Sequence, residues 1–91
     1  MKDQIIDTMM ARALQIDAAE RFPLFAWIVM HDQPEHPGWL IARLSTDHPS
    51  VYILRGGTLA DLRDMLLPGL ERSERQPTDP PEVVEVWFSV P

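Results

Sequence analysis

Residues 51–70 constrain the fold most, because they have the pattern of a strand, a tight turn, a helix and a stop. Four apolar or aromatic residues lead into Gly56 and Gly57, and glycine accepts the positive φ angles that a sharp exit from a strand often needs. Thr58 predicts a helix N-cap: its hydroxyl accepts the Asp61 amide, and the Asp61 carboxylate reaches back to the Thr58 amide. We therefore interpret Gly56, Gly57, Thr58 and Asp61 as structural residues. The helix that follows has a leucine-rich apolar face and ends at Pro68.

Residues 3–21 also have the composition of a helix, with an apolar stripe at helical spacing. Asp3 near its start and Arg21 near its end suit the helix dipole, and Pro23 stops it. Two alternatives remain open: the helix lies on the protein's own sheet, or it docks on a second copy, for which its adjacent methionines are well suited. The stripe comprises Ile6, Met9, Met10, Ala13, Leu14 and Ile16.

Three strands are expected between the two helices. Residues 25–31 are apolar on both faces, which indicates a central strand. Residues 39–44 place Leu40, Ala42 and Leu44 on one face, and residues 51–55 begin with four apolar or aromatic side chains. The short segment 46–50 between these strands predicts an antiparallel hairpin.

The end of the chain adds one more strand. Residues 71–82 are charged and rich in proline, so we expect an ordered surface connection without regular structure. Residues 83–90 form the last strand, which we place beside the first because a strand with two apolar faces favours neighbours on both edges.

The element order predicts an α+β fold, a single antiparallel sheet of about four strands with helices packed on it. The order is helix, strand, strand, strand, helix, strand. We expect one domain, residues 1–91, because a chain of this length buries one modest core. Its parts are the N-terminal helix 3–21 and the sheet and helix core 24–90.

Aromatic and charged residues within the strands raise the question of which face they occupy. If the second helix covers one face, Trp27, Trp39 and Trp87 are expected on the other, shielded by the N-terminal helix or a second subunit. Glu85 and Arg43 either pair across the sheet or lie on edge strands and face water, and the second interpretation is preferred.

Composition excludes several classes of protein. The net charge of −6 argues against neutralising phosphates, so we do not expect binding to nucleic acid. The absence of cysteine excludes disulfides and thiol chemistry and fits a reducing compartment. No apolar run matches a signal peptide or a membrane span, which predicts a cytoplasmic protein that does not bind membranes.

One polar group in the loops has metal-ligating side chains. His31, Asp32 and His36, with Glu35 nearby, are the candidate ligands, since imidazole and carboxylate bind zinc and non-haem iron. Their spacing matches no established metal motif, and the 46–50 loop lies at the opposite end of the hairpin. The serines lack a nucleophile elbow. We therefore expect no cofactor and no catalytic residues.

Several segments resemble a known group of proteins. WIVMHD, PGWLIARL, YILRGGTLADLR and ERSERQPTDPPEVVEVWF are similar to a group of small, uncharacterised proteobacterial proteins over residues 24–89. The turn at residues 56–62 also resembles that of HicB-type antitoxin domains. The second likeness implies a toxin-neutralising module that binds a small basic nuclease through its acidic surface. The chain departs from that pattern by its extra N-terminal helix and by lacking the DNA-binding segment that usually follows.

The leading hypothesis is a small bacterial protein that forms a homodimer and acts through protein contacts without catalysis. One alternative is the HicB-like module, which would bind a protein partner. The other is a protein that binds a small ligand or a metal through His31, Asp32 and His36. The expected dimer interface comprises Ile6, Met9, Met10, Ala13, Trp27, Trp39 and Trp87.

Overall fold

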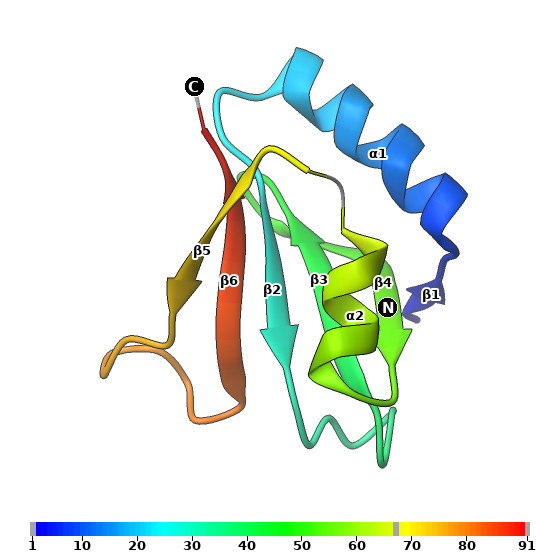
Figure 1. Cartoon of the computed structure of the whole chain (residues 1–91), viewed down its shortest axis with the longest axis vertical. Helices are drawn as coiled ribbons and strands as arrows, with labels where there is room; N and C mark the ends of the chain where they lie inside the picture. Colours follow the sequence, from blue (N-terminus) through cyan, green and yellow to red (C-terminus); the bar gives the residue numbers. More distant parts are fainter. Residues whose placement is uncertain (1, 67, 91) are drawn as a thin grey trace.

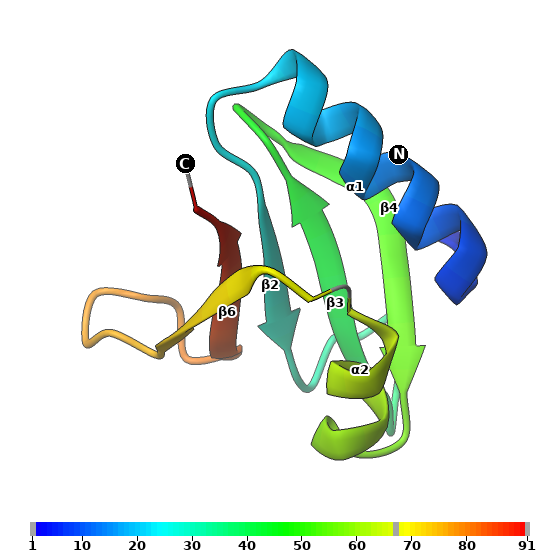
Figure 2. The same ribbon diagram turned by 45° about the horizontal axis from the view of Figure 1, so that its top comes forward.

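The computed structural model describes residues 2–66 and 68–90 and has the predicted α+β fold. The strands form one sheet in the order β1-β4-β3-β2-β6-β5, and both helices pack over the same face of it (Figure 1 and Figure 2). In chain order the elements are β1 (Gln4–Ile5), α1 (Thr8–Arg21), β2 (Ala26–Met30), β3 (Leu40–Ser45), β4 (Pro49–Gly56), α2 (Leu59–Met65), β5 (Leu70–Glu74) and β6 (Val83–Ser89).

The centre of the sheet agrees with the prediction. β2, β3 and β4 are consecutive antiparallel strands, and β6 pairs with the other edge of β2. Trp27 on β2 therefore lies between Leu44 on β3 and Trp87 on β6. The two apolar faces of β2 correctly indicated a strand with neighbours on both sides.

Two edge strands correct the prediction of about four. All of β5 except Leu70 lies in the segment expected to be an irregular connection. It pairs with β6 because the edge of β6 away from β2 would otherwise leave backbone N–H and C=O groups unpaired. Its polar side chains are typical of an edge strand and carry no apolar signal. β1 pairs in parallel with β4, with Gln4 opposite Tyr52, so the prediction of a wholly antiparallel sheet is wrong at this edge.

Helix α1 begins later than predicted and uses a different face. The Asp7 carboxylate accepts the Met10 amide at 2.8 Å, so Asp7 is the N-cap and the preceding residues are free to form β1. The helix lies on the protein's own sheet through Ala11, Gln15 and Ala18, which are buried. Small side chains allow this close approach, and the methionine stripe is left at the surface.

The turn from β4 into α2 forms as predicted, for a partly different reason. The Thr58 hydroxyl accepts the Asp61 amide at 3.1 Å, and Leu62 on the apolar face of α2 is fully buried. Neither Gly56 nor Gly57 has a positive φ; in the described residues the glycines that do are Gly38 and Gly69. Gly56 is needed instead because a Cβ there would lie 3.0 Å from the Leu62 nitrogen. The described hydrogen bonds do not include the expected second bond, from the Thr58 amide to the Asp61 carboxylate.

The tryptophans do not lie together opposite α2, so that prediction is wrong. Trp27 is fully buried on the face that carries both helices, and its Nε1 donates to Gln15 Oε1 at 2.9 Å. Trp87 packs against the same core. Trp39 is partly exposed at the end of the loop before β3, with the Arg55 guanidinium 4.3 Å from its ring centre. A buried tryptophan needs a partner for its N–H, and α1 supplies it.

Both interpretations of Glu85 and Arg43 are also wrong. β3 and β6 are interior strands, and Glu85 is only 3% exposed. Its carboxylate accepts bonds from Arg63 Nε of α2 at 3.0 Å and from Trp87 Nε1, while Arg43 pairs with Asp3. The sequence pattern of the strands alone did not indicate that α2 supplies the cation for Glu85.

Removing the charge of Glu85 should destabilise the fold. Glu85→Gln is expected to lower the free energy of unfolding by about 2 kcal/mol, because the isosteric amide cannot form the charge-assisted bonds to Arg63. Urea unfolding measures the change. Glu74→Gln is the matched control: Glu74 lies opposite Glu85 on β5 but is exposed, so its effect should stay within about 0.5 kcal/mol. Equal losses in the two variants would contradict a specific role for Glu85.

The contribution of Glu85 should also depend on pH. The Arg63 guanidinium, with smaller help from the Trp87 N–H, holds the pKa of Glu85 below its ordinary value of 4.5 despite desolvation. A lowered pKa stabilises the fold above the unfolded-state pKa, and this stabilisation is lost as the pH falls through the folded-state pKa. The stability difference between the wild type and Glu85→Gln should therefore be constant near neutral pH and shrink below pH 4.5. A difference that grows on acidification would contradict this account.

Candidate functional site

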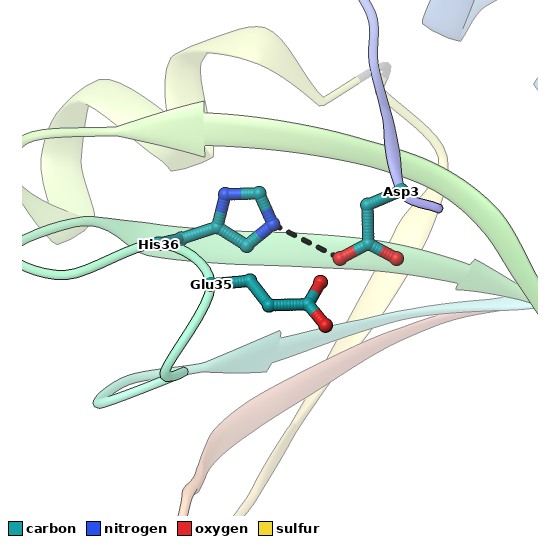
Figure 3. A group of neighbouring side chains, drawn as sticks. All are labelled: Asp3, Glu35 and His36. Atoms are coloured by element: carbon teal, nitrogen blue, oxygen red, sulfur yellow. Dashed lines mark hydrogen bonds and ion pairs between the residues drawn. The ribbon is translucent and has the colours of Figure 1, made fainter. Parts of the chain in front are cut away.

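A polar cluster forms where two distant segments meet beside β3. Asp3 precedes β1, and Glu35 and His36 belong to the loop between β2 and β3 (Figure 3). That loop folds back on itself: the His36 amide donates to the Gln33 carbonyl at 2.9 Å. One ligand atom from each of Asp3, Glu35 and His36 lies within 4.8 Å of the others. The chain thus gathers two carboxylates and an imidazole in one place.

Asp3 is the centre of this cluster. Its two carboxylate oxygens each accept a bond from Arg43 at 2.9 Å, and Oδ2 also accepts His36 Nε2 at 2.9 Å. Arg43 holds the pKa of Asp3 at about 2, with His36 adding to the effect and desolvation opposing it. Asp3 is therefore ionised throughout the neutral range, and its position is fixed by β3 on one side and the loop on the other.

His36 and Glu35 differ in how tightly they are held. His36 is only 6% exposed, and the bond from its Nε2 to a carboxylate places the hydrogen on that nitrogen. Glu35 is exposed, its carboxylate points toward that of Asp3 (Figure 3), and no ion pair of the described residues includes it. A cavity of about 180 Å³ adjoins the cluster; its lining is Asp3, Gln33, Pro34, Glu35, His36 and Arg43.

The structure separates the three metal candidates of the sequence. His31 Nδ1 lies 2.6 Å from Asp32 Oδ2 as a surface pair, whereas His36 joins Asp3 and Glu35. Sequence reasoning missed Asp3 because it was assigned to a helix and is 33 positions from His36. No local pattern links residues so far apart.

A second candidate site is an apolar groove of about 490 Å³ between β1, the start of α1 and β4, which we call the β1 groove. Large apolar side chains line it and remain open to water: Met9 is 81% exposed, Ile5 53% and Met10 49%. Its full lining is Gln4, Ile5, Ile6, Asp7, Met9, Met10, Ala13 and Tyr52.

Most of the expected interface residues lie at or near the β1 groove. Four of the seven, Ile6, Met9, Met10 and Ala13, line it. Trp39 lines an adjoining hollow that also contains Ile6. Trp27 and Trp87 lie elsewhere, within or against the core on the helix-bearing face. Ile5 and Tyr52 were not predicted to take part, because their proximity depends on the pairing of β1 with β4.

In comparisons with known proteins, no family model, curated protein or solved structure matches the chain. The resemblance to small proteobacterial proteins and to HicB-type domains therefore stays a prediction, as do the cytoplasmic location and the HicB-like function. Among the described residues, no helix is long and apolar enough to cross a membrane.

Loss of the Asp3 carboxylate should loosen β1. In the wild type the Ile6 amide donates to the Ile53 carbonyl at 2.9 Å, next to the segment that Asp3 ties to β3. Asp3→Asn is expected to speed hydrogen exchange of the Ile6 amide by about tenfold or more, because charge-assisted bonds contribute about 1.5–3 kcal/mol. Lys2→Gln, a change at the exposed neighbouring residue, is the control and should leave the rate unchanged. Equal exchange rates in Asp3→Asn and the wild type would contradict the role of the Asp3–Arg43 ion pair in holding β1.

Proposed function

We propose that this protein is a self-associating interaction module that forms a homodimer through the β1 groove and acts through protein contacts. The observation that carries the proposal is the clustering of exposed apolar side chains. Of the eight large hydrophobic residues that are exposed in the described part of the chain, four line this one groove: Ile5, Met9, Met10 and Tyr52. Contiguous apolar surface on a small protein is typical of a contact site, and methionine adapts to a partner surface.

The charge distribution supports a second copy as the occupant. Two copies that each carry a net charge of −6 repel one another, so association is favoured through a surface with few acids. The β1 groove contains one acidic residue, Asp7, and its carboxylate already caps α1. This surface therefore allows contact at little electrostatic cost.

The position of the groove also suits a twofold dimer. β1 is an edge strand, and a symmetric dimer brings the same edge of both subunits to the axis, so that each apolar residue meets apolar residues of the other copy. The exposed surface of the single chain, 5859 Å², exceeds the roughly 5,400 Å² typical of a monomer of its 10.4 kDa mass. Dimerisation would cover part of this excess.

A matched pair of substitutions on α1 tests the proposal. Ala13 and Ala19 are both exposed, but only Ala13 lines the β1 groove. Ala13→Glu should convert the dimer to a monomer at micromolar concentration, because it buries an unpaired charge in the interface. Ala19→Glu adds the same charge to the same helix and should leave the dimer intact. Sedimentation velocity measures both.

Two results would overturn the proposal. The first is a wild type that stays monomeric at all accessible concentrations. The second is a dimer whose dissociation constant does not change in Ala13→Glu, which would place the interface on another surface. Far-ultraviolet circular dichroism of each variant verifies that the helix is still formed.

A further inference from the structure

The polar cluster of Asp3, Glu35 and His36 contains the donor set of a metal site. Its ligand atoms lie within 4.8 Å of one another, whereas ligands around a tetrahedral zinc lie about 3.3 Å apart, given bonds of about 2.0–2.2 Å. Glu35 is exposed, so a change of its side-chain rotamer can bring its carboxylate closer to the ligand atoms of Asp3 and His36. Asp3 and His36 are already in contact.

The charges of the cluster leave room for a cation. Arg43 balances Asp3, but the described ion pairs give Glu35 no cationic partner, although its carboxylate points at another carboxylate (Figure 3). Two neighbouring carboxylates repel one another, and a bound dication would turn this repulsion into attraction.

The surroundings of the cluster resemble the support that metal ligands usually have. Arg43 donates a hydrogen bond to each carboxylate oxygen of Asp3. Carboxylates that bind metals are commonly held in this way by residues that do not touch the metal themselves. His36 is buried and held by the turn that its own amide closes on Gln33. The adjoining cavity of about 180 Å³ has space for water molecules as the remaining ligands.

Binding would require one proton rearrangement at His36. Its Nε2 now carries a hydrogen that it donates to Asp3. When Nε2 gives its lone pair to a metal, that hydrogen is released and Nδ1 takes one up, so the neutral imidazole keeps a single proton. The side-chain hydrogen bonds of the described residues include Nε2 of His36 but not Nδ1, and Nδ1 is not among the buried atoms that lack a partner, so solvent can supply this proton.

We propose that Asp3, Glu35 and His36 bind a first-row divalent cation, Zn²⁺ in particular, with Arg43 as the residue that positions Asp3. One imidazole with two carboxylates favours Zn²⁺ over Mg²⁺ and Ca²⁺, which prefer oxygen ligands alone. The bonds of Arg43 to Asp3 compete with the metal for that carboxylate, so the affinity is expected in the micromolar range. This site is separate from the β1 groove and does not depend on dimerisation.

Calorimetric titration of the chelator-treated protein with Zn²⁺ tests the proposal. The wild type should bind one ion per chain, and Glu35→Gln should lower the affinity by about tenfold or more. Glu71→Gln is the matched control, because Glu71 is an exposed acid on β5 outside the cluster, and its affinity should equal that of the wild type. Since Glu35 is exposed, its substitution leaves folding intact.

Histidine ring signals in nuclear magnetic resonance spectra show where the ion binds. The first equivalent of Zn²⁺ should shift the His36 signals and leave those of His31 and His48, both in loops, unchanged. Three results would overturn the proposal: no binding below millimolar Zn²⁺, a first response at His31 or His48, or wild-type affinity in Glu35→Gln.

Discussion

Asp3 joins the N-terminal segment to two neighbouring parts of the chain that are far from it in sequence, β3 and the loop before β3. Its carboxylate accepts two bonds from Arg43 and one from His36. Arg43 in turn donates to the Ser50 carbonyl on β4, so this single ion pair also spans the hairpin. The position of β1 depends on the Asp3–Arg43 ion pair. The residues of β1 line part of the β1 groove, and Asp3 lines part of the polar cavity.

A second carboxylate has a corresponding role on the opposite face of the sheet. Glu85 is buried beneath α2 and receives bonds from Arg63 and Trp87. Gln15 similarly ties α1 to Trp27. Each helix is thus held by apolar packing together with one specific polar contact, which fixes where the helix lies along the sheet. Both helices pack on one face of the sheet. The N-terminal segment and the loop before β3 can therefore form the polar cluster on the other face.

Much of the fold could be predicted from the sequence, because its central elements carry strong local patterns. The two apolar faces of β2, the β3–β4 hairpin and the Thr58 cap were all correctly inferred. The errors concern contacts between distant residues. β5 forms through backbone pairing with β6 and has no apolar period, and β1 forms because Arg43 and β4 hold residues that otherwise favour a helix.

The candidate sites could be predicted less completely for the same reason. The methionine stripe of α1 was recognisable as an apolar surface, but Ile5 and Tyr52 join it only through the parallel pairing of β1. Glu35 and His36 were visible as possible ligands, but their partner Asp3 was not. Tertiary pairing, which one sequence does not reveal, decides which polar residues meet.

The claim that two copies meet at the β1 groove is tested most directly by nuclear Overhauser effects between an isotope-labelled and an unlabelled copy in a mixed sample. Our account predicts contacts across the two copies from the methyl groups of Met9 and Met10, on the exposed side of α1. Met30 on β2 lies outside the groove and the hollow that adjoins it, and should show none. Contacts confined to Met30, or no contacts between copies, would contradict it.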